Sequence, residues 1–318
     1  MRVLFMGTPD FSVQFLRKIM ETDEIVAVVT RVDRPSRRGH RLEYGEVKKF
    51  ALEKKFTLFQ PEGINDTNFV ERAKELNLDL IVVVAFGKIL PPEILRIPQK
   101  GCVNIHFSLL PRYRGPAPVQ WALLNGDSYT GVSSIFMNEE VDEGEIILQR
   151  KVPIDSEDNY LSLLEKLCEV GVNLLEETLD LIREGKASPY PQDDSGASYA
   201  PFLKKSDGHI VWNDSSHRIL NRIRALNPWP GTYVKVNSGK KVKILEAKIA
   251  PVPLEANKRG FPKPGEIVEI RKGEGFVIAC SEGGLLVTRV QLESKSIQGA
   301  YDYLQGARLK VGDIWGKQ

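Results

Sequence analysis

Residues 80–86 read LIVVVAF, an uncharged run of apolar and β-branched side chains. A run of this length and composition is typical of a strand that is buried on both faces of a sheet. Along the chain on both sides, shorter apolar runs alternate with stretches whose apolar residues have helical spacing. The expected strands are 2–6, 25–30, 80–85, 103–107, 131–137 and 145–148, and the expected helices are 11–20, 47–55, 68–76 and 91–97. This alternation predicts an α/β fold with a doubly wound, largely parallel, Rossmann-like sheet.

The second part of the chain has a different pattern. Residues 160–184 have the apolar stripe of a long amphipathic helix, which ends a first domain at 1–184. Residues 185–205 are rich in Pro, Gly, Ser and Asp, as is typical of an interdomain linker. After a helix at 216–226, short strands recur at a spacing of roughly 8–12 residues. They predict a small, OB-like β-barrel domain at 206–318, in which a second short helix follows near 297–304.

The composition indicates a globular protein, with 318 residues, 42% hydrophobic and 27% charged. No run approaches the roughly 20 apolar residues of a membrane helix, and the N-terminus lacks the features of a signal peptide. Cys102, Cys168 and Cys280 lack the spacing of a disulfide framework or a zinc site, so we expect three small buried hydrophobes in a reducing compartment. These features predict a cytoplasmic protein that needs no membrane.

The net charge of +2 is unevenly distributed. Residues 1–190 carry 24 Lys and Arg against 29 Asp and Glu, whereas residues 191–318 carry 20 against 13. A basic second domain is compatible with a polyanionic partner, although a modest excess of this kind often serves only solubility.

The residues most suggestive of chemistry lie at 103–121, which read VNIHFSLLPRYRGPAPVQW. Because strand side chains alternate between faces, Asn104 and His106 should point one way and Phe107 the other. Ligands of open α/β sheets bind beyond the carboxyl ends of the strands, where this pair would lie. The acidic turn NEEVDEGE at 138–145 could bring Asp142 beside His106, where a carboxylate can orient the ring or accept a proton. A buried polar pair and a solvated turn remain the alternative.

Other motifs are missing from the sequence. There is no GxGxxG fingerprint, no Walker A loop, and no strand–GxSxG–helix elbow around Ser108. The four histidines do not have the spacing of metal ligands, so no metal site is expected.

Basic residues occur in two places that could contact phosphates. The segment 31–41, RVDRPSRRGHR, holds five arginines and reads as an exposed loop near the site edge of the sheet. Later candidates lie before and on the 216–226 helix. The candidate contacts are Arg34, Arg37, Arg38 and Arg41 in the loop, and Lys204, Lys205, Arg218 and Arg222 beyond it. A solvated surface is an equally good interpretation of either group from composition alone.

Taken together, these residues resemble the 10-formyltetrahydrofolate-dependent formyltransferase family. The likeness rests on Asn104-Ile-His106-Phe-Ser108-Leu-Leu-Pro111, on Arg112-Tyr-Arg114-Gly, and on Asp142, about 35 residues after His106. The opening GTPDF at 7–11, the arginine-rich loop and NPWPG at 227–231 resemble the members that act on initiator methionyl-tRNA.

The resemblance implies roles for individual residues. Asn104, His106 and Asp142 match the catalytic trio. The folate co-substrate would contact the segments that contain Ser108, Leu109, Leu110 and Pro111, and Phe86, Gly87, Ile89 and Leu90. The 31–41 loop and the second domain would bind the tRNA. Two departures are Phe107, where a small residue is usual, and Asp142-Glu143-Gly144-Glu145 in place of Asp-Thr-Gly-Asp.

The implied activity is transfer of a formyl group from 10-formyltetrahydrofolate to the amino group of methionine on initiator tRNA, by a protein we expect to be a monomer. Within the family, a sugar-nucleotide amine formyltransferase and a formyltetrahydrofolate hydrolase remain alternatives. Glycinamide ribonucleotide formyltransferases lack a second domain. A non-catalytic RNA-binding protein is the alternative from another class, and a nicotinamide oxidoreductase is suggested by fold class alone.

Overall fold

The computed structural model describes residues 1–33, 44–236, 239–253 and 260–316. The chain divides into two compact units, which are treated separately below. The first comprises residues 1–118, 129–153 and 164–201, and the second comprises 119–128, 154–163 and 202–318.

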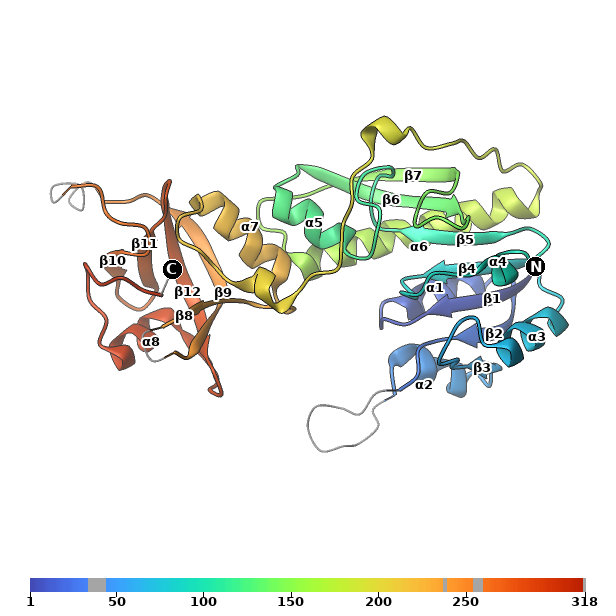
Figure 1. Cartoon of the computed structure of the whole chain (residues 1–318), viewed down its shortest axis with the longest axis horizontal. Helices are drawn as coiled ribbons and strands as arrows, with labels where there is room; N and C mark the ends of the chain where they lie inside the picture. Colours follow the sequence, from blue (N-terminus) through green and yellow to red (C-terminus); the bar gives the residue numbers. More distant parts are fainter. Residues whose placement is uncertain (34–43, 237–238, 254–259, 317–318) are drawn as a thin grey trace. The chain divides into compact units, whose positions relative to one another are not determined.

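The first unit is built on a seven-stranded sheet in the order β3-β2-β1-β4-β5-β6-β7 (Figure 1). Its strands are β1 (Arg2–Gly7), β2 (Glu24–Val29), β3 (Leu58–Phe59), β4 (Leu80–Val84), β5 (Cys102–His106), β6 (Tyr129–Phe136) and β7 (Ile146–Pro153). The first five run parallel, and β6 and β7 are antiparallel to their neighbours. The expected α/β sheet, largely parallel, is therefore confirmed.

Helices cover both faces of this sheet. They are α1 (Ser12–Ile19), α2 (Glu46–Glu53), α3 (Thr67–Glu75), α4 (Pro92–Leu95) and the long α6 (Tyr160–Arg183). On one face, alternate residues of β1, β2 and β4 pack against Phe69 of α3 and Ile94 of α4. On the other face α6 comes close, since a Cβ at Gly171 would lie 3.1 Å from Phe15 of α1 and 3.6 Å from Val132 of β6.

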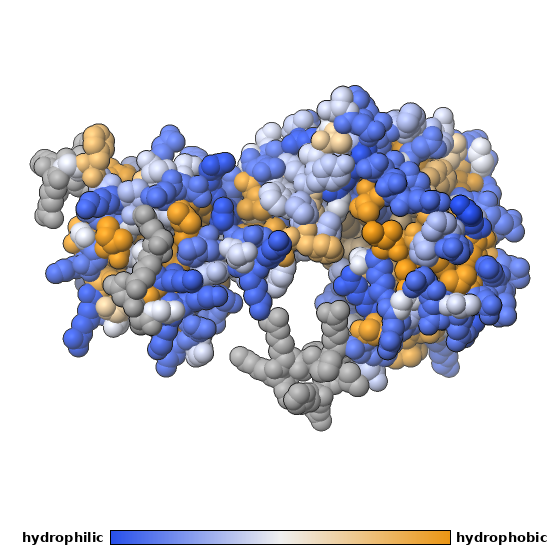
Figure 2. Space-filling view, viewed as in Figure 1, coloured by the Kyte–Doolittle hydropathy of each residue, from blue (hydrophilic) through white to orange (hydrophobic). Residues whose placement is uncertain are grey.

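The second unit holds an antiparallel sheet in the order β10-β11-β12-β9-β8, with β13 paired to β12. Its elements are α7 (Ser216–Leu226), β8 (Thr232–Lys235), β9 (Lys241–Ala250), β10 (Ile267–Arg271), β11 (Gly275–Ala279), β12 (Gly284–Leu292), β13 (Ile297–Gly299) and α8 (Ala300–Ala307). The core centres on Trp212, whose indole N–H donates to the Trp315 carbonyl at 2.7 Å, and on Phe276. On the face of this unit seen in Figure 2, hydrophilic side chains surround smaller hydrophobic patches.

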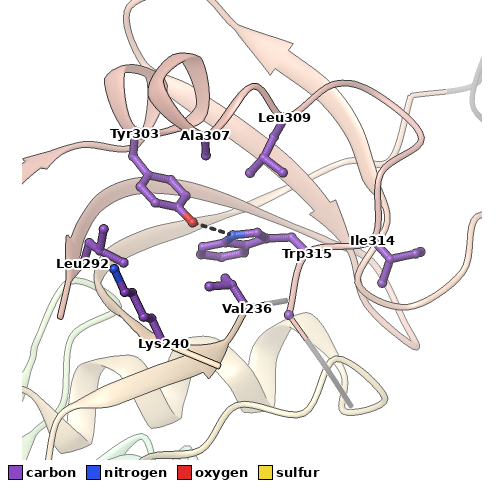
Figure 3. A pocket seen from close by; sticks show the side chains of 9 residues that line it. Val236, Lys240, Leu292, Tyr303, Ala307, Leu309, Ile314 and Trp315 are labelled. Carbon is purple, nitrogen blue, oxygen red and sulfur yellow. Dashed lines mark hydrogen bonds between the residues drawn. The ribbon is translucent and has the colours of Figure 1, made fainter. Parts of the chain in front are cut away.

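A pocket of about 340 Å³ lies beside this core (Figure 3). Its walls are mostly apolar, and the Trp315 indole N–H donates to the Tyr303 hydroxyl at 3.3 Å at its edge. Lys240 supplies the one charged lining side chain among the described residues. Its polar groups are thus limited to this Trp315–Tyr303 pair and Lys240 among the described lining residues, and the rest of the wall is aliphatic or glycine.

The units divide the chain differently from the expected domains. Residues 185–201, expected as part of a linker, cluster with the first unit, where Tyr190 and Ile146 exchange two backbone hydrogen bonds of 2.9 and 3.0 Å. Residues 154–163 cluster with the second unit, where the Arg224 guanidinium donates to the carbonyl of Ser156 at 2.9 Å. Pro, Gly and Ser prevent regular structure, but they do not prevent packing.

Three further observations concern the cysteines, membrane-spanning helices and metal ligands. The three cysteines are free and buried, as expected, and burial raises the pKa of the Cys102 and Cys168 thiols to about 12. None of the helices in the described part of the chain has the length and apolarity that a bilayer crossing requires. Among the same residues, His, Cys, Asp and Glu side chains do not gather in threes as metal ligands would.

Candidate active site

Asn104 and His106 lie at the carboxyl end of β5, the interior strand at which the sheet changes from parallel to antiparallel pairing. Both side chains project from the same face, as the alternation along the strand requires. His106 is 5% exposed and Asn104 is partly exposed. The strand therefore presents one sheltered ring and one more accessible amide at the edge where α/β sheets bind ligands.

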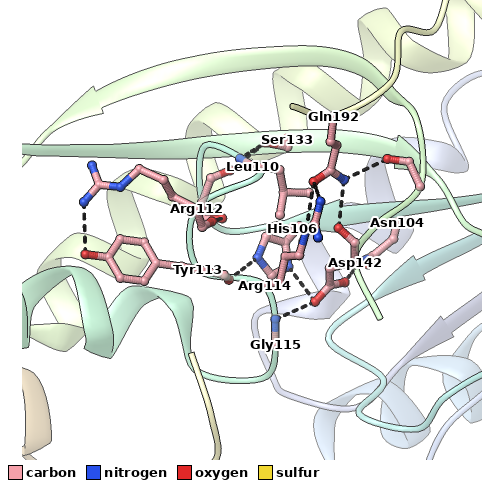
Figure 4. Close-up of polar contacts among 12 residues, drawn as sticks. Asn104, His106, Leu110, Arg112, Tyr113, Arg114, Gly115, Ser133, Asp142 and Gln192 are labelled. Atoms are coloured by element: carbon pink, nitrogen blue, oxygen red, sulfur yellow. Dashed lines mark hydrogen bonds and ion pairs between the residues drawn. The ribbon is translucent and has the colours of Figure 1, made fainter. Parts of the chain in front are cut away.

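Asp142 lies between these two side chains (Figure 4). The Asn104 amide donates to Asp142 Oδ1 at 3.2 Å, and His106 Nδ1 is 3.5 Å from Oδ2. The Gly115 backbone N–H also donates to Oδ2, at 2.8 Å. Asp142 has φ of 56°, in the left-handed region, which Asp tolerates better than most residues. The turn therefore places the Asp142 carboxylate within reach of both Asn104 and His106.

The other ring nitrogen of His106 faces a backbone carbonyl. Nε2 lies 2.9 Å from the oxygen of Tyr113, which also has a left-handed backbone with φ of 62°. Because a carbonyl can only accept, Nε2 must carry a hydrogen in this arrangement. One donor of His106 is therefore committed to the protein, and the Nδ1 side is the one that faces Asp142.

The segment after β5 is bound tightly to β6 and β7. The Ser133 hydroxyl donates to the Ser108 carbonyl at 2.6 Å and accepts from the Leu110 N–H at 3.1 Å, while the Gln149 amide donates to the Leu110 carbonyl at 2.9 Å. The Ser108 hydroxyl donates to the Arg112 carbonyl at 2.6 Å. Ser108 and Leu110 are buried, whereas Leu109 and Pro111 are partly exposed. Ser108 is thus held in the turn by hydrogen bonds through both its hydroxyl and its carbonyl.

The second expected folate segment follows β4, at the same edge of the sheet. Phe86 and Leu90 are 1% and 2% exposed and belong to the hydrophobic core on the α3 and α4 side. Ile89 is 66% exposed and Gly87 is also exposed. Only Gly87 and Ile89 of this set therefore present surface to a ligand, and Phe86 and Leu90 fix the position of the turn.

A polar network behind Asp142 was not anticipated from the sequence. The Gln192 side chain donates to the carbonyls of Asp142 and Gly144, each at 2.8 Å. Arg114, which is buried, donates to Gln192 Oε1 and to Asp194 Oδ1, and it pairs with Glu143 at 3.0 Å. Burial alone would lower the pKa of Arg114, but the bond to Asp194 and the charge of Glu143 outweigh it and raise the pKa. Glu143, one of the two departures in the acidic turn, is therefore neutralised locally.

Phe107 points away from the site. Its ring makes edge contacts with Phe11 and Phe15, with centroids 5.5 and 6.1 Å apart, and it is 6% exposed. The large residue at this position therefore fills the space between β5 and α1.

Phe107→Ala is expected to lower the free energy of unfolding by about 3–5 kcal/mol through loss of buried area and the cavity left behind. Turnover by the folded fraction should stay within a few-fold of wild type. Urea unfolding combined with activity per folded molecule measures both. Phe261→Ala, at a side chain 96% exposed, should stay within about 0.5 kcal/mol. Lost activity with unchanged stability would instead place Phe107 against the reactants.

The eight candidate phosphate contacts fall into three groups: four outside the described residues, three exposed and one with internal hydrogen bonds. Arg34, Arg37, Arg38 and Arg41 lie outside the described residues. Lys204 and Lys205 are exposed, as is Arg218. Arg222 is used internally, because its guanidinium donates to the carbonyls of Asp207 and His209 at 3.0 and 3.3 Å.

Comparison with protein families accounts for most of the chain. Residues 1–179 match the family model described as formyl transferase, and residues 203–308 match the model described as formyl transferase, C-terminal domain.

Two relatives that match over the full length of the chain are similar to it at more than 40% identity. A methionyl-tRNA formyltransferase of Moorella thermoacetica is 44% identical over 317 residues, covering 99% of each chain. A methionyl-tRNA formyltransferase of Lachnospira eligens is 41% identical over 318 residues, covering 100% of each chain.

Solved structures share the fold at lower identity. HypX from Aquifex aeolicus in complex with tetrahydrofolic acid is 21% identical with a TM-score of 0.66, covering 100% of this chain and 50% of that one. WlaRD, a sugar 3N-formyl transferase, is 20% identical with a TM-score of 0.66, covering 93% of this chain and 99% of that one.

Proposed function

Because this chain belongs to the formyl transferase family, we propose that it transfers the formyl group of 10-formyltetrahydrofolate to the amino group of methionine on initiator methionyl-tRNA. The observation that carries the proposal is the contact of Asp142 with both Asn104 and His106, in a chain that matches methionyl-tRNA formyltransferases from end to end. The product would be N-formylmethionyl-tRNA for translation initiation. The protein would act in the cytoplasm, as a monomer.

The reaction forms a bond between the amine nitrogen and the formyl carbon and breaks the bond from that carbon to the folate nitrogen. Negative charge develops on the formyl oxygen. Asn104 is suited to stabilise it, since one amide hydrogen binds Asp142 and the second is left to donate. Removal of one such donor typically lowers turnover about 10²–10³-fold. His106 is the second candidate donor in its imidazolium form, because Nε2 already carries the hydrogen that binds Tyr113 and Nδ1 must hold a second hydrogen in order to donate.

A proton must also leave the attacking amine and reach the folate nitrogen that departs. Asp142 is the acceptor placed for the first half of this transfer, and His106 at 3.5 Å can pass a proton to it or from it. General acid–base assistance of this kind contributes about 10²–10⁴. The remaining acceleration would come from holding the amine and the formyl group together.

The residues at the sheet edge fit a folate co-substrate. Ile89 offers an exposed apolar side chain for a flat ring, and the partly exposed Leu109 and Pro111 lie on the neighbouring segment. We propose that Gly87, Ile89 and the 108–111 segment line the folate site, and that Phe86 and Leu90 support it from the core. The folate then supplies the formyl group as a co-substrate.

The double substitution Lys204→Ala, Lys205→Ala is expected to raise KM for tRNA and leave KM for folate unchanged. Both lysines are exposed, and removing each lysine that binds a phosphate should flatten the slope of log affinity against log salt by about one unit. Measuring KM for tRNA across a salt series tests this. Lys100→Ala, an exposed lysine before β5 at the opposite end of the strand, is the matched control. A slope equal to that of wild type would remove Lys204 and Lys205 from the tRNA site.

The activity itself is tested by following consumption of 10-formyltetrahydrofolate with three acceptors. Turnover that requires charged initiator tRNA supports the proposal. Equal consumption without tRNA would identify a hydrolase, and formylation of amino sugar nucleotides instead of tRNA would identify a sugar enzyme. Binding of tRNA without turnover would leave only an RNA-binding protein.

A further inference from the structure

We infer that Gln192 is a positioning residue for the reaction, which holds Asp142 in its reactive geometry through the backbone of the turn. Gln192 lies in the 185–201 segment, about 50 residues after Asp142 in sequence, and has no hydrogen bond to Asn104 or His106 among the described residues. The inference rests on the proposed function, because it assigns Gln192 a part in formyl transfer.

Gln192 uses both its donors and its acceptor, each toward a different part of the site (Figure 4). Its Nε2 donates to the carbonyl oxygens of Asp142 and Gly144, each at 2.8 Å. Its Oε1 accepts from Arg114 Nε at 3.1 Å and Nη2 at 2.9 Å. The amide therefore joins two residues of the acidic turn to one buried cation.

The hydrogen bonds to the turn are made where its geometry is set. Asp142 has a left-handed backbone, and the carbonyls that Gln192 binds lie on Asp142 itself and two residues later. A shift of these carbonyls would carry the Asp142 carboxylate away from Asn104 and His106. Because the distance from Asp142 to His106 is already 3.5 Å, a small shift is enough to break this interaction.

Only an amide of this length can make this connection. Glutamate would keep the acceptor toward Arg114, but its second oxygen would face two carbonyl oxygens and repel them. Methionine would keep the volume and remove every hydrogen bond. Arg114 holds the Oε1 end of the Gln192 amide in place. It is 3% exposed, and its guanidinium also forms ion pairs with Glu143 and Asp194.

Gln192→Glu and Gln192→Met are expected to lower kcat for formyl transfer about 10- to 100-fold, because misplacement of a reacting group by about 1 Å has effects of this size. KM for tRNA and for 10-formyltetrahydrofolate should stay within about two-fold, because the hydrogen bonds of Gln192 are made to Arg114 and to the backbone of the acidic turn. Gln305→Met, at an exposed glutamine on α8, is the matched control and should have wild-type kcat.

A double-mutant cycle separates positioning from general support of the fold. If Gln192 acts through the Asp142 carboxylate, Gln192→Met should cause almost no further decrease in the Asp142→Ala background, as measured by single-turnover transfer. An equal decrease in both backgrounds would overturn the inference, as would wild-type kcat for a folded Gln192 variant. If Gln192→Met does not fold, the same cycle with Gln192→Glu decides. Absence of transfer by the wild-type protein would instead refute the proposed function.

Discussion

Asp142→Ala is expected to lower single-turnover formyl transfer about 10²–10⁴-fold while tRNA binding stays close to wild type. The carboxylate contacts both Asn104 and His106, so its removal takes away the proposed proton acceptor and the polar partner of both side chains at once. The Gly115 N–H, which donates to Asp142 Oδ2 at 2.8 Å in the wild-type protein, also loses its acceptor. This loss should loosen the loop after β5. Rapid-quench measurement with saturating donor and charged tRNA isolates the chemical step.

Glu140→Ala is the control for this substitution, because Glu140 is an exposed acid two residues earlier in the same turn. It removes the same charge from the same region and should leave the rate within about two-fold of wild type, as exposed charges act weakly at a distance. If Asp142→Ala transferred formyl groups as fast as Glu140→Ala, Asp142 would have no catalytic part.

Gly144→Ala is expected to have the second large effect, on the turn that carries Asp142. A Cβ at Gly144 would lie 1.7 Å from the backbone oxygen of Phe136, so the backbone of β6 or of the turn must move. Overpacking of this kind costs about 3 kcal/mol of unfolding free energy, and the displaced turn would also be deprived of its hydrogen bonds from Gln192. Transfer should fall by at least about 10²-fold in the folded protein.

Gly306→Ala provides the comparison, since a Cβ there meets nothing within 4 Å and the residue lies in α8. Alanine in a helix should stabilise the protein by roughly 0.5–1 kcal/mol. Chemical unfolding and single-turnover rates of the two variants test the contrast. A Gly144→Ala protein with wild-type stability and rate would show that the turn tolerates a side chain and does not fix Asp142.

Much of the fold could be predicted from local pattern. The continuous apolar run at 80–86 correctly indicates a buried strand, β4, and the apolar stripe at 160–184 indicates α6 nearly to the residue. Both signals are strong because burial on two faces, or along one long stripe, constrains many side chains in sequence. The two-residue β3 and the helix α5 (Pro118–Asn125) were missed, because β3 is too short to have a period and α5 begins in a proline-rich loop.

The C-terminal elements show where local pattern is ambiguous. The sequence predicts a short helix near 297–304, but residues 297–299 form β13 and the helix α8 begins at Ala300. The pairing of β13 with β12 is a tertiary contact that periodicity does not encode. The α7 helix, in contrast, is predicted with its observed bounds, and in the structure the Ser215 hydroxyl caps it by accepting from the Arg218 N–H at 3.3 Å.

In the candidate site too, some contacts follow from local pattern and others depend on the folded structure. Strand alternation is enough to place Asn104 and His106 on one face and Phe107 on the other, and the structure brings Asp142 beside them. The sequence could not indicate that the Tyr113 carbonyl accepts a hydrogen bond from His106 Nε2. This bond depends on a left-handed backbone at Tyr113, which is not a glycine. Nor could it reveal Gln192, whose segment has the composition of a linker. A glutamine becomes significant only when its partners are known.

The most direct test uses 10-formyltetrahydrofolate labelled in its formyl carbon, mixed for one turnover with charged initiator methionyl-tRNA. The aminoacyl ester is then hydrolysed and the position of the label is determined. Label on the methionine amino group with the wild-type protein, and its disappearance with Asp142→Ala, is the expected result. Label found only in free formate, or equal transfer by Asp142→Ala, would contradict formyl transfer to methionyl-tRNA through Asn104, His106 and Asp142.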